Sequence, residues 1–144
     1  MDSAAYLKLI NSCNYKIEEK EEEIAKLKRE ISEGEEAAEG ARRLKSDFDD
    51  FVERKKQKNK IQNKGWLVKS FSSFISQAND LLCGNEYTRA NDRVLEINER
   101  IINDLEKLRE DLNCCNYELE QLKKERNGLY AEYQECLNSE KKGE

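Results

Sequence analysis

The sequence predicts an all-α fold, an elongated antiparallel helical hairpin with a coiled-coil seam. The chain of 144 residues contains no proline, a residue that would interrupt a helix. Apolar residues recur at alternating spacings of three and four along two long stretches, which is typical of a coiled coil. Charged residues make up 40% and apolar residues 37%, as expected for helices that bury one stripe and expose the rest to water. We therefore expect one helical-hairpin domain over residues 1–144.

The first stretch predicts a helix over about residues 4–62. Its spacings alternate between four and three as far as Ala41 and then continue at three, four and three. Opposite charges four residues apart, such as Glu22 and Lys26, favour a solvated helix surface. The predicted seam is Tyr6, Ile10, Cys13, Ile17, Lys20, Ile24, Leu27, Ile31, Gly34, Ala38, Ala41, Leu44, Phe48 and Phe51.

Small residues occupy this predicted seam from Gly34 to Ala41. Glycine inside a helix costs about 1 kcal/mol relative to alanine, so a compensating contact is expected. Either a partner helix or a bulky side chain approaches closely here, or the seam is locally thin or kinked.

The predicted corner is a turn at about residues 63–66, followed by a second helix over about 67–138. Basic residues from Arg54 to Lys64 precede it, and they either complement the helix C-terminus or contact an acidic partner or membrane surface. Because Gly84-Asn85 is typical of a helix stop, the second helix is either continuous or broken at about 83–86. Its predicted seam is Ala90, Val94, Ile97, Ile101, Leu105, Leu108, Leu112, Cys115, Leu119, Leu122, Arg126, Leu129, Tyr133 and Cys136.

The position of the corner sets the pairing expected between the two helices. With a corner near residue 65, position n faces roughly 130 − n. Tyr6 then faces the region of Lys124, and about the last 20 residues overhang. Tyr130 and Tyr133 lie on this overhang, either as contact residues or in a frayed tail.

The composition argues against catalysis, metal binding and nucleic-acid binding. Histidine is absent, so the commonest general base and zinc ligand are missing. The five cysteines are irregularly spaced without a C-x-x-C, and the adjacent Cys114 and Cys115 diverge by about 100° on a helix, one into the seam and one away. A net charge of −5 disfavours nucleic acid as a partner. We expect no enzymatic activity, no cofactor and no metal.

The sequence also bears on localisation. No apolar run approaches the length of about 20 residues that spans a bilayer. The first residues lack a basic region followed by an apolar one. We expect no transmembrane segment, no cleavable signal peptide, and a protein that is either cytoplasmic or exported together with its partner.

The residues around the single tryptophan carry a resemblance to a known family. Trp66 lies between the two runs and Phe74 follows eight residues later, with Ser70 and Phe71 between them. This arrangement resembles the WxG-like helical hairpins of type VII secretion in Gram-positive bacteria. In length and polarity the chain is most similar to the YwqH-like proteins that accompany LXG-domain toxins of Firmicutes.

Two features depart from that family's pattern. Val68 stands where the family has a glycine, whereas Gly65 precedes the tryptophan. The family's export signal, an aromatic residue followed at the fourth position by an acid, is met by neither Tyr130 nor Tyr133. A member with these departures would rely on its partner's signal for export, or would stay in the cell.

The resemblance implies a non-catalytic adaptor or targeting factor that binds the N-terminal helical region of a secreted toxin, with or without a second small helical protein. The apolar stripes are too long for two helices to shield completely, which also favours a partner helix. The alternative is a structural coiled-coil protein that forms a homo-oligomer and has no link to secretion. The residues expected to contact a partner are Trp66, Phe71, Phe74, Ile17, Ile24, Leu27, Ile31, Leu108, Leu112, Leu119, Tyr130 and Tyr133.

Overall fold

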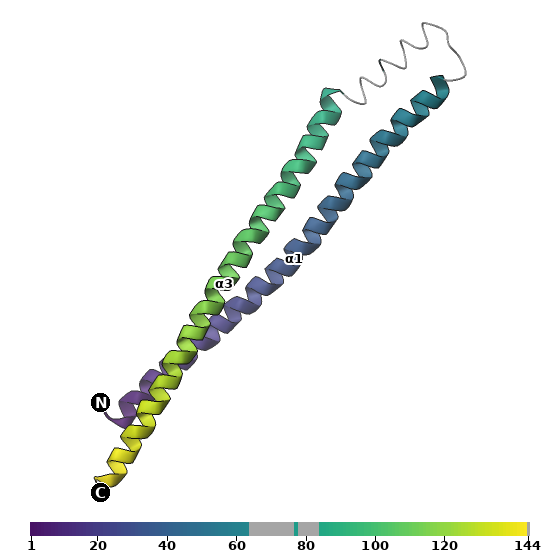
Figure 1. The fold of residues 1–144 in the computed structure, drawn as a ribbon. Coiled ribbons are helices and arrows are strands. Elements are labelled where there is room, and N and C mark those ends of the chain that lie inside the picture. The colour runs from purple at the N-terminus through teal and green to yellow at the C-terminus, as the bar shows by residue number, and fades with distance from the viewer. Residues whose placement is uncertain (64–76, 78–83, 144) are drawn as a thin grey trace. The chain divides into compact units, whose positions relative to one another are not determined.

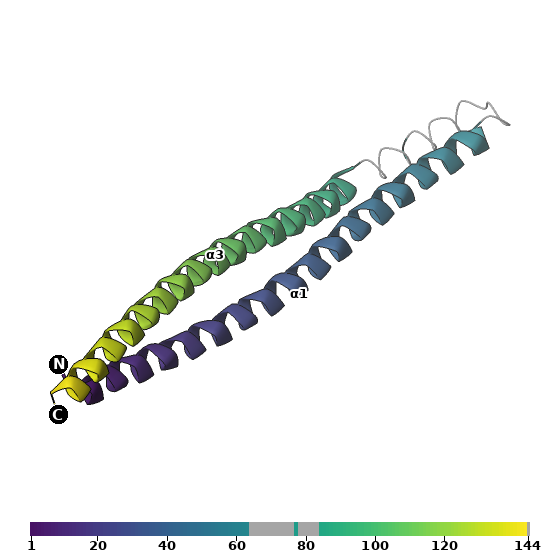
Figure 2. The same cartoon turned by 60° about the horizontal axis from the view of Figure 1, so that its bottom comes forward.

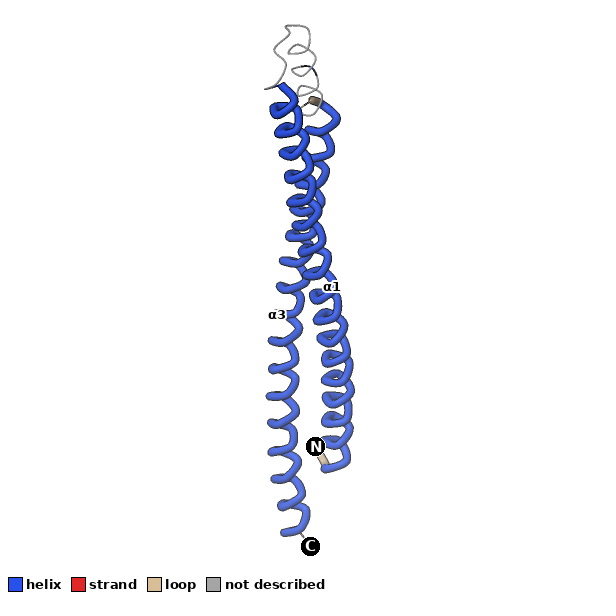
Figure 3. The backbone as a smooth tube through the Cα atoms, turned by 90° about the vertical axis from the view of Figure 1, so that its right-hand side faces the viewer, coloured by secondary structure: helices blue, strands red, loops and turns tan. Residues whose placement is uncertain are grey.

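A computed structural model describes residues 1–63, 77 and 84–143, without the side chains of residues 58–63 and 85. Two long helices account for nearly all of the described residues, α1 (Ser3–Asn63) and α3 (Asn85–Lys142) (Figure 1). The described ranges contain no strand, and Figure 3 shows helix almost throughout them. The prediction of an all-α helical hairpin is confirmed. The predicted turn at 63–66 and the corner residues Trp66, Phe71 and Phe74 lie outside the described residues or at their edge.

Side chains and charges favour the start of α1 and both ends of α3. Asp2 caps α1, because its carboxylate Oδ1 accepts a hydrogen bond from the Ala5 amide at 2.8 Å. In α3, Glu86 lies in the first turn and Lys141 and Lys142 lie in the last turn. Acidic residues at a helix N-terminus and basic residues at its C-terminus both complement the helix dipole.

The chain divides into two units, each built from one segment of α1 and one segment of α3. Unit 1 comprises Met1–Ser32 and Glu106–Glu144, and unit 2 comprises Glu33–Leu105. Within each unit the two helical segments run antiparallel (Figure 2). Inside each unit, the seam residues of α1 therefore face the seam residues of α3.

Unit 1 has a coiled-coil seam of the predicted kind. Its buried apolar residues follow the alternating spacing of three and four, and Ile10 is only 2% exposed. They are Ile10, Cys13, Ile17, Ile24 and Cys115.

The pairing in unit 1 differs from the predicted one. Tyr6 donates a hydrogen bond to Glu132 and does not face the region of Lys124. Further along, the hydroxyl of Ser3 donates to Glu140 Oε2 at 3.1 Å. The predicted overhang was therefore wrong, since the last turns of α3 pair with the first turn of α1. Apolar periodicity alone does not define this offset between the two helices.

Unit 2 departs from the predicted seam at three apolar residues. Leu44, Phe51 and Ile97 were expected in the seam, but they are 53%, 42% and 49% exposed. Lys45, Val52 and Asn98 are the half-buried residues beside them. Each of these three residues continues the strict seven-residue spacing of the neighbouring seam residues. The helices therefore keep one heptad register, even where it places the polar Lys45 and Asn98 in the seam. The seam predictions for Leu44, Phe51 and Ile97 were wrong.

A lysine in the seam of unit 1 illustrates how a polar residue is accommodated. Lys20 Nζ lies 2.5 Å from Glu118 Oε2 and 3.1 Å from Glu23 Oε2. The hydrogen bond to Glu118 and then that to Glu23 raise the pKa of Lys20, and Lys20 lowers the pKa of Glu23. Sliding α3 along α1 would separate Lys20 from Glu118. The ion pair therefore disfavours other alignments of the two helices.

The adjacent cysteines confirm the predicted divergence, because Cys114 is exposed and Cys115 is buried. Burial raises the pKa of the Cys115 thiol, and it raises that of Cys13 as well. In the native protein we expect N-ethylmaleimide to modify Cys114 at least about tenfold faster than Cys115 or Cys13. Mass spectrometry of peptides after timed labelling measures these rates. Equal rates at Cys114 and Cys115 would contradict the seam.

The same thiols give a pH dependence. Because the thiol pKa is higher in the folded state, the unfolded chain loses the thiol proton first as pH rises. The stability is therefore unaffected at pH values below the ordinary thiol pKa of about 8.5 and falls above it. We expect the free energy of unfolding to decline above that pH and to decline less in a variant with Cys13→Ala and Cys115→Ala.

Candidate protein-binding surface in unit 2

The positions that flank the seam distinguish the two units. In a heptad the seam residues are a and d, position e follows d, and position g precedes a. Taking Ile10 as a places Leu9, Lys16, Glu23 and Glu30 of unit 1 at position g of α1, so three of these four residues are charged and only Leu9, 42% exposed, is apolar. Charged flanks are typical of a two-stranded coiled coil that is complete in itself.

In unit 2 the same flanking positions carry large apolar side chains. Leu44 and Phe51 are at position g of α1, and Ile97 is at position g of α3. Leu95 and Ile102 are at position e of α3 and are 47% and 52% exposed. Helices that are apolar at a, d and also e or g are typical of bundles with more than two helices.

Ion pairs and hydrogen bonds show which flanking positions share a side of the helix pair. In unit 1 Lys20 bridges Glu23 and Glu118, which are the g positions of the two helices. In unit 2 Lys45 Nζ bonds Asp49 Oδ1, at position e, and Asn91 Oδ1 across the seam. Position g residues therefore lie on one side of the pair and position e residues on the other, as in antiparallel coiled coils generally.

We name the two sides of unit 2 by their residues. The apolar flank consists of Ala37, Leu44 and Phe51 of α1 with Ala90 and Ile97 of α3, and the exposed Asp104 occupies the remaining position g of α3. The groove flank consists of Arg42, Asp49 and Lys56 of α1 with Thr88, Leu95 and Ile102 of α3.

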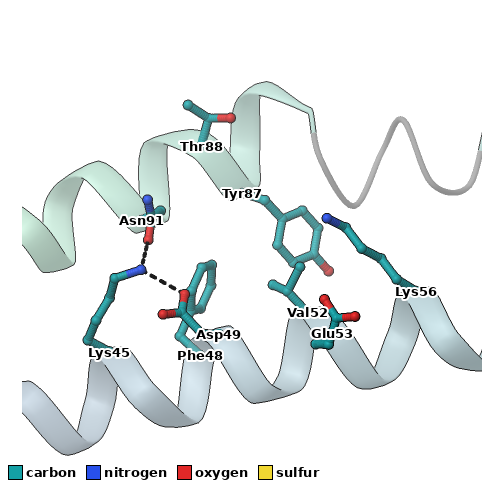
Figure 4. A pocket seen from close by; sticks show the side chains of 9 residues that line it. All are labelled: Lys45, Phe48, Asp49, Val52, Glu53, Lys56, Tyr87, Thr88 and Asn91. Atoms are coloured by element: carbon teal, nitrogen blue, oxygen red, sulfur yellow. Dashed lines mark hydrogen bonds and ion pairs between the residues drawn. The ribbon is translucent and has the colours of Figure 1, made fainter.

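A groove of about 420 Å³ opens on the groove flank (Figure 4). Phe48, Val52 and Tyr87 give it an apolar, half-buried lining, and the Phe48 and Tyr87 ring centroids lie 6.2 Å apart. At one end Lys45 is held by Asp49 at 2.7 Å and by Asn91 at 2.5 Å. An apolar floor with fixed polar groups at its edge suits an apolar side chain presented by another helix.

The small residues of α1 have a specific explanation in unit 2. A Cβ built on Gly34 would lie 2.6 Å from Leu105 Cδ2 and 3.3 Å from Leu105 Cγ, whereas one on Gly40 would meet nothing within 4 Å. Leu105 is buried, with 5% exposure. The sequence left open a close approach by a bulky group or a thin, kinked seam over residues 34–41. At Gly34 the explanation is close approach of a bulky side chain, which comes from α3 of the same chain.

All but one of the residues predicted to contact a partner along the helices lie within the hairpin's own seam, and Tyr130 lies at the flanking position e. Ile17 and Ile24 are buried, and Tyr130 is exposed. The half-buried ones are Leu27, Ile31, Leu108, Leu112, Leu119 and Tyr133. Their role in partner binding stays a prediction, since α1 and α3 of unit 1 already pair through most of them.

Reasoning from apolar periodicity missed the exposed apolar residues of unit 2 as candidate contacts. Leu95 and Ile102 were not assigned to the seam. Leu44, Phe51 and Ile97 were assigned to the seam but lie outside it. Extending the exact seven-residue spacing from Ile10 to residues 45 and 52 would have placed Leu44 and Phe51 outside the seam.

The described part of the chain holds no cluster of three or more His, Cys, Asp or Glu side chains that could hold a metal ion. Among the described residues, no helix has the length and apolarity needed to cross a membrane. The fold and this surface define the chain as a helical-hairpin protein with an uncovered apolar surface. Comparison with protein-family models, with curated proteins and with solved structures finds no match.

Proposed function

We propose that the chain is a non-catalytic helical adaptor, and that it binds the N-terminal helical region of a larger secreted toxin. The observation that carries the binding role is the exposed apolar surface of unit 2, where Leu95 and Ile102 flank a completed seam. The toxin as partner, and type VII export as the pathway, rest on the sequence around Trp66 and Phe74 that resembles the secretion family.

In this proposal a partner helix lies along the groove flank. Leu95 and Ile102 are seven residues apart, so they offer two contacts about 10 Å apart on one line of α3. An apolar side chain of the partner would enter the groove against Phe48, Val52 and Tyr87. Such binding by a helix face with anchors at intervals of three, four and seven residues needs no chemistry from the chain.

Charges around the groove would orient the partner. Lys56 and Glu53 lie on the α1 side, while Lys45 is already engaged by Asp49 and Asn91. A partner helix with an acid near Lys56 and a base near Glu53 would be favoured over one with the opposite order. Rim charges of this kind contribute more to specificity and association rate than to affinity.

The test is affinity capture of the tagged chain from its native cells, with the bound proteins identified. We expect a larger protein with a helical N-terminus and a separate toxin-like domain. Leu95→Glu with Ile102→Glu should reduce its recovery at least about tenfold, because a charge would be placed at each apolar contact. Leu7→Glu is the matched control, since Leu7 is an exposed leucine of unit 1 and its replacement should leave recovery unchanged.

Two results would count against parts of this proposal. Recovery of the tagged chain alone would contradict the adaptor role and leave the self-associating coiled coil as the function. Recovery of a toxin that is unaffected by Leu95→Glu and Ile102→Glu would keep the role but move the site. In that case Trp66→Ala with Phe74→Ala tests the corner residues that carry the family resemblance.

A further inference from the structure

We infer that the partner helix on the groove flank carries a basic edge, formed by lysine or arginine side chains that contact α3. The inference rests on the proposed function, because it names the charge of the helix that the groove receives. It comes from two acidic side chains, Asp92 and Glu99, which border the apolar contacts of unit 2.

Asp92 and Glu99 form an outer row beside the apolar residues of α3. Both are at position b, which lies next to position e on the side away from the seam. Asp92 precedes Leu95 by three residues, and Glu99 follows it by four. Glu99 also precedes Ile102 by three. Residues at these spacings are neighbours on a helix surface, so a helix that covers the two apolar residues also meets both carboxylates.

Neither carboxylate is neutralised within the hairpin. Both side chains are exposed, and neither forms an ion pair within the part of the chain that the structure describes. The residues three and four positions from Glu99 are Leu95, Glu96, Ile102 and Asn103. None of them is basic, and one adds a like charge. Asp92 has a single basic neighbour at these spacings, Arg89, with which it forms no ion pair.

The other arginines close in sequence lie on a different side of α3. Arg93 and Arg100 directly follow Asp92 and Glu99, but they are at position c. Adjacent residues diverge by about 100° around a helix, so these two arginines do not border the groove flank. The outer row therefore presents negative charge to a helix that lies against α3.

The α1 side of the groove adds no net charge. Arg42 and Asp49, at position e, are each held in an ion pair, at 2.9 and 2.7 Å. Glu53 and Lys56 line the groove with one charge of each sign (Figure 4). The unbalanced charge on the groove flank is therefore the acidic row of α3.

This charge defines the chemistry of the partner helix. Its apolar stripe covers Leu95 and Ile102 and enters the groove, and lysine or arginine follows the edge of that stripe nearest α3. A helix with an acidic edge would instead meet Asp92 and Glu99 with like charges, which disfavours it. Charges at the border of an apolar contact act mainly on the association rate and on the choice of partner.

Association kinetics with the protein captured from native cells test the basic edge. Asp92→Lys with Glu99→Lys should slow association at least about tenfold at low ionic strength. The difference should largely vanish at about 1 M salt, which screens exposed charges but does not repair a misfolded variant. Asp47→Lys with Asp50→Lys is the matched control, because it changes the net charge equally at positions c and f of α1. The control should associate within about twofold of the wild-type rate.

The outcomes separate this inference from the proposed function. Leu95→Glu with Ile102→Glu removes the apolar contacts, so it should weaken binding whatever the salt concentration. If that variant loses binding while Asp92→Lys with Glu99→Lys associates as fast as wild type, the adaptor role stands and the basic edge is overturned. Equal slowing by the control would also overturn it, because total charge would then be responsible. Capture of no partner would contradict the proposed function and this inference with it.

Discussion

Gly34→Ala is expected to lower the free energy of unfolding by about 1–2 kcal/mol, whereas Gly40→Ala is expected to raise it by about 1 kcal/mol. Both substitutions gain the helix propensity of alanine. Only the first places a methyl group 2.6 Å from Leu105 Cδ2, in a buried contact that has to shift. Urea unfolding followed by circular dichroism, at one protein concentration for all variants, measures both changes.

A double variant separates the clash from other effects of the Gly34 substitution. Leu105→Ala removes the side chain that the new methyl group meets, so Gly34→Ala should cost nothing in that background and should even stabilise it. The two substitutions are then strongly non-additive. Equal stabilisation by Gly34→Ala and Gly40→Ala in the wild-type background would show that Leu105 does not pack on Gly34.

Ile10→Ala should destabilise the protein by about 3 kcal/mol, the other large effect that we expect. Ile10 is 2% exposed in the seam of unit 1, so its truncation leaves a cavity between α1 and α3. Leu7→Ala, one turn earlier on the same helix, removes a similar amount of side chain at 43% exposure. That control should change the stability by less than about 0.5 kcal/mol.

A third substitution, at Ser3, tests the pairing of the chain ends. If the last turns of α3 overhung α1, Ile10 would still be covered, but the first turn of α1 would gain nothing from Glu140. Ser3→Ala is a minor probe of this pairing, because it removes the hydrogen bond from the Ser3 hydroxyl to Glu140 Oε2 but keeps the one from the Ser3 amide to Oε1. Similar losses for Ile10→Ala and Leu7→Ala would contradict a seam on one face of α1.

Much of the fold was accessible from the sequence, because a long heptad pattern admits few structures. The spacing of Ile10, Cys13, Ile17 and Ile24 placed these residues in a seam, and all four are buried. The divergence of Cys114 and Cys115 followed from helix geometry alone. The offset between α1 and α3 did not follow, because sliding one helix by a whole heptad leaves the apolar pattern of the seam unchanged.

The surface of unit 2 was less accessible because apolar and polar residues exchange their usual places there. Lys45 and Asn98 are half-buried, while Leu44 and Ile97 beside them are exposed. Apolar periodicity points to the leucine and the isoleucine, although both lie outside the heptad register that Lys45 and Asn98 continue. The sequence offered two explanations for the small residue at Gly34, a close contact or a thin seam. It could not identify Leu105 as the side chain that makes the contact.

The measurement that tests the account most directly is hydrogen exchange of the chain alone and in the complex captured from native cells. Helices whose exposed apolar side chains become covered open less often, so their amides exchange more slowly. We predict added protection in unit 2, over residues 42–57 of α1 and 86–103 of α3, with unit 1 unchanged. Added protection confined to unit 1, around Ile17–Ile31 and Leu108–Leu119, would contradict the account, because the partner would then bind through the hairpin seam.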